Sequence, residues 1–133
     1  MRQSNFQYFQ SDDSVKLDHS VLLVSDRPRS IAFYECLMPM LGFRKTAKHV
    51  FGNSDGIYVD IRQAENVDHA YERFAPGLNH IGFTARDRDS ITRIQSDMKK
   101  AGFNVPDVQV FGEGVAIFLK DPDGMRIEVG VNG

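Results

Sequence analysis

Apolar and polar residues follow a strand-then-helix pattern in the first half of the chain. Residues 17–24 are rich in aliphatic and β-branched side chains, which is typical of a strand. Residues 26–30 supply turn and helix-capping chemistry, and Gly42 is a typical residue after a helix end. Short strands are expected near 43–50 and 57–62. Between the cap and the glycine, apolar residues recur near helical spacing: Ile31, Tyr34, Leu37, Met38 and Leu41.

The second half of the chain repeats this order of elements. Residues 79–85 predict a strand, and residues 90–101 predict a helix that ends before Gly102. The turn residues 121–124 precede the last expected strand. The strands after this helix are expected near 107–111, 115–119 and 125–130.

The two halves also match residue by residue. Residues 17–27 resemble residues 78–88, and residues 56–61 resemble residues 124–129, in the same order along the chain. Chance explains one such match easily and several collinear matches poorly. A repeated supersecondary unit explains them directly.

The repeat predicts an α+β fold of two βαβββ modules within one domain spanning 15–133. The first module covers about 17–62 and the second about 78–130, with a linker at 63–77 and an N-terminal tail at 1–14. One module cannot bury the inner face of a four-stranded sheet alone. Modules paired within a chain or across a dimer are expected to form a curved mixed sheet with helices outside, and the cup between the paired sheets is a natural ligand cavity.

Composition removes several classes of function. The 133 residues include 16 basic and 18 acidic side chains, for a net charge of −2, so nucleic-acid and membrane-surface binding lack electrostatic support. A single cysteine, Cys36, excludes an intrachain disulfide framework and a multi-cysteine zinc site, and we expect it to be a core residue. No signal peptide or membrane-spanning run is visible, so we expect a cytoplasmic protein with a small-molecule substrate.

The repeated polar residues predict a metal site. His19 and His80 are equivalent in the two modules, as are Asp60 and Glu128. Strand alternation places these acids on the face opposite the apolar side chains. Two imidazoles with one or two carboxylates suit Zn²⁺, Ni²⁺, Mn²⁺, Co²⁺ or Fe²⁺ and leave positions for substrate. For Asp60, the alternative is a salt bridge with a neighbouring arginine.

Other side chains are candidates for substrate contact. Tyr58 and Arg126 share the expected cup face with the acids, so they either contact an anionic or aromatic substrate or pair with Asp60. Phe111 precedes the flexible segment 112–114, which is either a lid or a hairpin loop. Glu128 is the candidate catalytic residue, because a carboxylate beside the metal can move a proton between neighbouring carbons.

Three stretches resemble the glyoxalase/bleomycin-resistance/dioxygenase proteins of the vicinal oxygen chelate superfamily. Residues 18–34 resemble the first strand and helix of these proteins, and residues 76–83 resemble the opening of their second module. Residues 121–129 resemble their closing D-P-D-G-x-x-x-E signature. The resemblance spans about 16–130 and implies metal-centred chemistry on a substrate with adjacent oxygens.

The resemblance leaves the reaction open, because the fold hosts many activities. It implies metal ligands at His19, His80 and Glu128, while Asp60 stands where glyoxalase I has a glutamate. A glyoxalase-type lyase or isomerase is the leading expectation, and an extradiol-type dioxygenase or a metal-free drug-binding protein are the alternatives. A homodimer is expected, because relatives usually build the site from modules of two chains.

Overall fold

The computed structural model describes residues 14–132 as two four-stranded mixed sheets and two helices. It confirms the predicted α+β fold of two βαβββ modules. The N-terminal tail expected at 1–14 lies, except for Ser14, outside the described residues. No helix among residues 14–132 is both long and apolar enough to cross a membrane.

In both modules the first strand pairs in parallel with the last one. The first sheet has the order β1-β4-β3-β2, and the second has the order β5-β8-β7-β6. The first module consists of β1 (His19–Val24), α2 (Arg27–Met40), β2 (Arg44–Ala47), β3 (Val50–Gly52) and β4 (Tyr58–Gln63). The second consists of β5 (His80–Thr84), α3 (Arg88–Lys100), β6 (Gln109–Phe111), β7 (Gly114–Lys120) and β8 (Arg126–Val131).

The helices begin and end at the same kind of residue. Asp26 accepts a hydrogen bond from the Arg29 backbone N–H, and Asp87 accepts one from Ser90 in the same way. Gly42 and Gly102 follow the helix ends with φ of 85° and 94°, a left-handed conformation that glycine adopts without strain. The repeat in the sequence therefore encodes matching helix boundaries.

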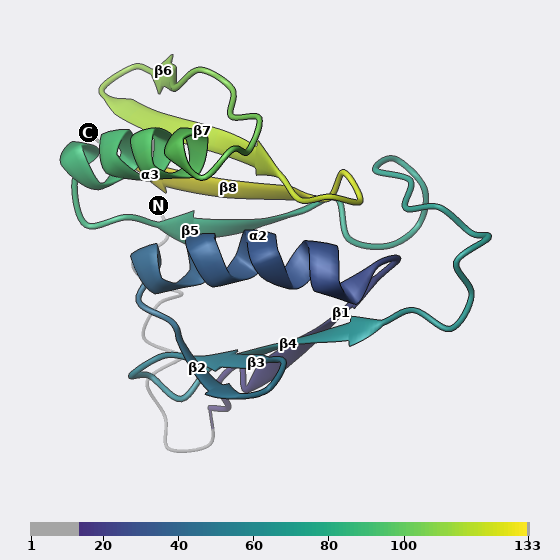
Figure 1. Cartoon of the computed structure of the whole chain (residues 1–133). Helices are drawn as coiled ribbons and strands as arrows, with labels where there is room; N and C mark the ends of the chain where they lie inside the picture. Colours follow the sequence, from purple (N-terminus) through teal and green to yellow (C-terminus); the bar gives the residue numbers. More distant parts are fainter. Residues whose placement is uncertain (1–13, 133) are drawn as a thin grey trace.

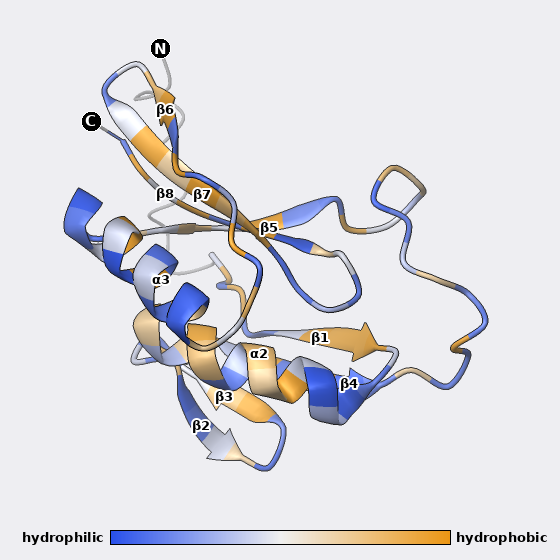
Figure 2. Cartoon of the chain, turned by 45° about the horizontal axis from the view of Figure 1, so that its top comes forward, coloured by the Kyte–Doolittle hydropathy of each residue, from blue (hydrophilic) through white to orange (hydrophobic). Residues whose placement is uncertain are grey.

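The helices lie between the two sheets (Figure 1). α2 packs on the first sheet, α3 packs on the second, and the two helices contact each other. Figure 2 shows hydrophobic residues along α2, β1 and β7, whereas hydrophilic residues dominate α3. Within one chain the sheets are not closed into the expected cup, because each sheet turns its apolar face inward onto its own helix. The core side chains that face the helices include Leu22, Val24, Val59, Ile61, Ile117, Leu119, Ile127 and Val129.

The opposite face of each sheet has no helix against it. Strand alternation places His19, Val21 and Leu23 on this face of β1, where all three are exposed. His80 and Gly82 are exposed on the corresponding face of β5. These two surfaces are called the open faces below.

A hydrogen-bond network ties the first module to the turn that starts β8. The Tyr34 hydroxyl in α2 donates to Asp121 Oδ2 at 2.7 Å, and Asp121 Oδ1 accepts from the backbone N–H groups of Asp123 and Met125, both at 2.9 Å. The Ser25 backbone N–H, after β1, donates to Asp123 Oδ2 at 3.0 Å. The D-P-D-G stretch thus joins the modules as well as forming a turn. Burial raises the pKa of the Asp121 carboxyl, although its hydrogen bonds lower it, and burial beside this acid raises the Tyr34 pKa well above its usual value.

Two glycines of the second sheet should respond in opposite ways to alanine. A Cβ at Gly114 would lie 2.8 Å from the Val131 carbonyl oxygen, whereas a Cβ at Gly82 meets nothing within 4 Å. We expect Gly114→Ala to lower the free energy of unfolding by about 1–3 kcal/mol. Gly82→Ala should leave it unchanged or raise it by about 0.5–1 kcal/mol. Urea denaturation measures both, and equal losses in the two variants would contradict the open face at Gly82.

The buried Asp121 carboxyl should make stability depend on pH. Because folding raises its pKa, the stabilisation is full below the unfolded pKa, about 3.9, and is lost as pH rises through the folded pKa. Relative to Asp121→Asn, the parent should therefore lose unfolding free energy as pH rises above the unfolded pKa of about 3.9. Urea denaturation at several pH values measures this difference, with Asp107→Asn as the exposed control. A difference that is flat or rises with pH would contradict the buried acid.

Candidate functional site

The second module places His80 beside Glu128 on its open face. The parallel pairing of β5 with β8 sets Gly82 opposite Glu128 and His80 opposite Arg126. His80 Nε2 lies 3.3 Å from Glu128 Oε1, and the two side chains are 42% and 34% exposed. An imidazole nitrogen and a carboxylate oxygen thus stand together at a solvent-accessible surface.

The first module repeats this arrangement in the same register. Val21 lies opposite Asp60, and His19 lies opposite Tyr58. Asp60 therefore has the same strand position relative to His19 that Glu128 has relative to His80. Asp60 differs in its partner, because its Oδ2 accepts a hydrogen bond from Arg62 Nε at 2.7 Å.

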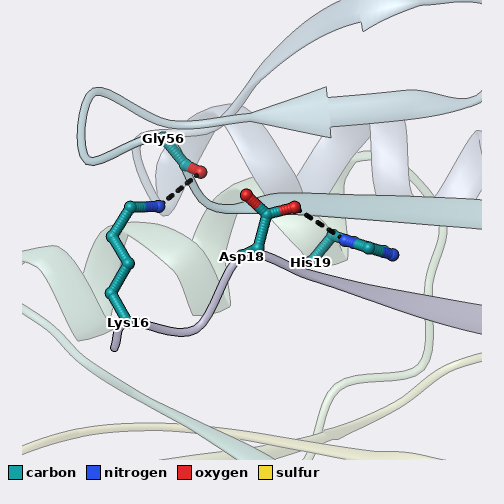
Figure 3. A network of polar contacts seen from close by, with 4 residues as sticks. All are labelled: Lys16, Asp18, His19 and Gly56. Atoms are coloured by element: carbon teal, nitrogen blue, oxygen red, sulfur yellow. Dashed lines mark hydrogen bonds and ion pairs between the residues drawn. The ribbon is translucent and has the colours of Figure 1, made fainter. Parts of the chain in front are cut away.

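Each histidine ring is held by the side chain of the residue before it. His19 Nδ1 is 2.7 Å from Asp18 Oδ2, a contact drawn in Figure 3, and His80 Nδ1 is 2.8 Å from Asn79 Oδ1. A ring that donates its Nδ1–H to an oxygen keeps the lone pair on Nε2, which is the form that binds a metal. In Figure 3 the His19 ring extends away from the Asp18 carboxylate, and Lys16 holds the Gly56 carbonyl nearby.

Asp18 and Asn79 were not among the predicted site residues. The signal was present, because an oxygen-bearing side chain directly precedes each of the equivalent histidines. Adjacent strand residues point to opposite faces, so a contact between their side chains was not expected from alternation alone. Both contacts occur where the chain enters the strand, which is where this alternation begins.

The four candidate ligands form two pairs in one chain. Among residues 14–132, no group of three or more histidine, cysteine, aspartate or glutamate side chains is arranged to hold a metal ion. His80 and Glu128 lie together on the second sheet, while His19 and Asp60 belong to the first. One pair, a histidine and an acid, therefore lies on each of the two open faces.

A hollow of about 480 Å³ adjoins Glu128 on the second sheet. Small residues leave room in it, namely Gly82, Ala116 and Gly130. Phe111 and Phe118 form one wall, with ring centroids 6.2 Å apart and planes at 78°. Phe111 is 57% exposed, so its ring is accessible to a ligand.

The other candidate contact residues lie in different surroundings. Tyr58 is on the open face of the first sheet, where its ring lies over Gly52. Arg126 lies beside His80 on the second sheet, and its Nε is buried without a hydrogen-bond partner in the described part of the chain. The Cys36 thiol is partly buried, and burial raises its pKa, so it is a poor nucleophile.

Comparison with known proteins agrees with this architecture. The family sequence model of the Glyoxalase/Bleomycin resistance protein/Dioxygenase superfamily matches residues 16–129. Virulence protein STM3117 of Salmonella typhimurium is 28% identical over 121 residues, which cover 86% of this chain and 82% of that protein.

Solved structures share the fold at low sequence identity. A glyoxalase-family protein from Bacillus halodurans has a TM-score of 0.75 and 23% identity, over 94% of this chain and 98% of the other. The fosfomycin resistance protein FosX from Listeria monocytogenes has a TM-score of 0.69 and 19% identity, over 90% and 94%. Lactoylglutathione lyase from Agrobacterium tumefaciens has a TM-score of 0.65 and 15% identity, over 91% and 96%. Because the family model covers almost the whole chain, this protein belongs to the Glyoxalase/Bleomycin resistance protein/Dioxygenase superfamily.

Proposed function

We propose that the protein is a metal-dependent lyase or isomerase of glyoxalase type, with each active site shared between two copies of the chain. Its substrate is a small cytoplasmic molecule that binds the metal through two adjacent oxygens. The main support is that each module has a histidine and an acid on its open face, in the same strand register. These residues are His19 and Asp60 in the first module and His80 and Glu128 in the second. Each imidazole is held through Nδ1, so that Nε2 is available to a metal.

The distribution of the four side chains favours a shared site. A twofold axis can bring the first module of one copy against the second module of the other, and it does so twice per dimer. His19 and Asp60 would then complete the set of the partner's His80 and the partner's Glu128. Val21 and Leu23, which are 40% and 66% exposed, supply apolar surface for this contact beside His19.

The donor atoms suit a divalent transition metal. Two imidazole nitrogens and a carboxylate oxygen favour Zn²⁺, Ni²⁺, Mn²⁺, Co²⁺ or Fe²⁺ over Mg²⁺ or Ca²⁺. One or two carboxylates also offset the charge of the ion. When bound, such an ion supplies a Lewis acid for charge that develops on a substrate oxygen.

Glu128 is the residue that we propose to move the proton. Its carboxylate lines the hollow next to Gly82 and Gly130, which leave space for substrate carbons. Its Oε1 lies 3.3 Å from His80 Nε2, and its partial exposure leaves it accessible. A carboxylate in this place can take a proton from one carbon and return it to the neighbouring one.

One observation favours a second candidate function, an extradiol-type dioxygenase. The Arg62 guanidinium holds Asp60, which leaves His19, His80 and Glu128 as the ligand set. Two histidines and one carboxylate are the ligands of non-haem Fe²⁺ oxygenases. Turnover of methylglyoxal–thiol adducts supports the first function, whereas ring cleavage of catechols by the iron-loaded protein supports the second.

Removing His80 should abolish metal retention. His80→Ala takes away the imidazole beside Glu128, and a site with only one imidazole left should not hold the ion against dialysis. The exposed linker variant His69→Ala is the control and should retain the parental amount. Elemental analysis after dialysis gives the metal per chain, and full occupancy in His80→Ala would refute the ligand role.

Mixing two inactive variants tests whether the site is shared. His19→Ala and His80→Ala should each bind no metal alone. After they are refolded together, half of the dimers are mixed, and each mixed dimer has one intact site, so metal should recover to about a quarter of the parental amount. Elemental analysis and analytical ultracentrifugation measure metal and dimer. No recovery from mixed dimers would contradict a site shared between chains.

A further inference from the structure

A second hollow, of about 520 Å³, is lined by residues of α2 and of the second module and adjoins the Glu128 hollow at Phe118. Three cations line it, from α2, β7 and β8: Arg29, Lys120 and Arg126. We infer that this basic hollow binds a carboxylate or phosphate group of the substrate, so that the substrate class is small organic anions. This inference rests on the proposed function and adds to it a second point of recognition.

The strand register places this hollow next to the candidate ligands. Arg126 lies opposite His80 on one side and opposite Lys120 on the other, while Phe118 lies opposite Glu128. Arg126 and Glu128 are two residues apart on one strand face, a spacing of about 7 Å. Phe118 lines both hollows. One small molecule can therefore reach both Glu128 and the cations.

The cations around this hollow lack acidic partners. Arg29, Lys120 and Arg126 form no ion pair with a carboxylate within residues 14–132, although several other cations of the chain do. Asp121 also lines the hollow, but its oxygens accept hydrogen bonds from Tyr34, Asp123 and Met125. The hollow therefore carries a net positive charge beside a carboxylate that is already engaged.

The Arg126 side chain carries the most specific signal. Its Nε is buried and has no hydrogen-bond partner in the part of the chain that the structure describes. Buried N–H donors without an acceptor are rare, because losing water without a replacement costs free energy. An oxyanion in the hollow gives the Arg126 guanidinium an acceptor, which a guanidinium can bind through two parallel hydrogen bonds.

Aromatic side chains give the hollow an apolar wall. Phe33 and Phe103 line it and contact each other edge to face, with ring centroids 5.3 Å apart. Phe118 closes the side toward Glu128. A low-dielectric wall strengthens the attraction between a cation and an anion and accommodates an apolar substituent. Anions that carry an aromatic or aliphatic group fit these surroundings best.

Binding of three small probes to the metal-free protein tests the inference. Benzoate and phenyl phosphate present the two oxyanions on the same ring, and benzyl alcohol is the neutral control. Amide chemical shifts of residues 118–126, followed during NMR titration, report binding. We expect at least one anion to bind at least about tenfold more tightly than benzyl alcohol, and the better of the two identifies carboxylate or phosphate as the group.

Variants connect this binding to the hollow. Arg126→Met should weaken the better anion at least about tenfold, and Arg126→Lys, which keeps the charge but loses the two-pronged donor, should weaken it less. Lys100→Met removes an exposed cation of α3 and should leave the affinity unchanged. If Arg126→Met does not fold, Lys120→Met takes its place with the same expectation.

Two outcomes would overturn the inference. One is equal binding of benzyl alcohol and both anions, and the other is unchanged anion affinity when Arg126 or Lys120 is replaced. The NMR titration uses metal-free protein, so its result does not depend on the outcome of the metal-retention test with His80→Ala. Anion binding with a failed metal test would overturn the proposed function alone, and metal retention without anion binding would overturn only this inference.

Discussion

The parallel pairing of the first and last strand of each module is the constraint on which the rest of the structure depends. It brings His80 beside Glu128, although 47 residues separate them in the sequence, and it gives His19 and Asp60 the same relative register. A slip of one residue in either ladder would turn the acid to the helix side, because side chains alternate between faces. Core packing of the alternate residues, such as Ile127 and Val129, therefore also positions the chemistry.

The placement of the helices determines which surfaces remain for function. Each helix covers the apolar face of its own sheet, and the helices contact each other, so the other face of each sheet is turned outward. The two pairs of candidate ligands lie on these outward faces. In the dimer that we propose, one twofold contact would bury both open faces and complete two sites.

In the second module, the D-P-D-G turn, Arg126 and Glu128 follow one another closely along the chain. The turn that begins β8 is held by Tyr34 and Ser25 from the first module, and β8 then carries Arg126 and Glu128 in succession. The inter-module hydrogen bonds thereby fix the strand that supplies both an acid and a cation. Recognition of an anion and transfer of a proton would then depend on the same short strand.

The sequence by itself determined the modules, the helix boundaries and the candidate residues, because these depend on local periodicity, on capping residues and on an internal repeat. It left open whether Asp60 pairs with an arginine, and the structure shows Arg62 in that place. Only the tertiary structure decided the Tyr34–Asp121 bond, the separation of the candidate ligands into two pairs and the basic hollow at Arg126. These depend on strand register and on how helices pack between sheets, which bring together residues that no local pattern connects.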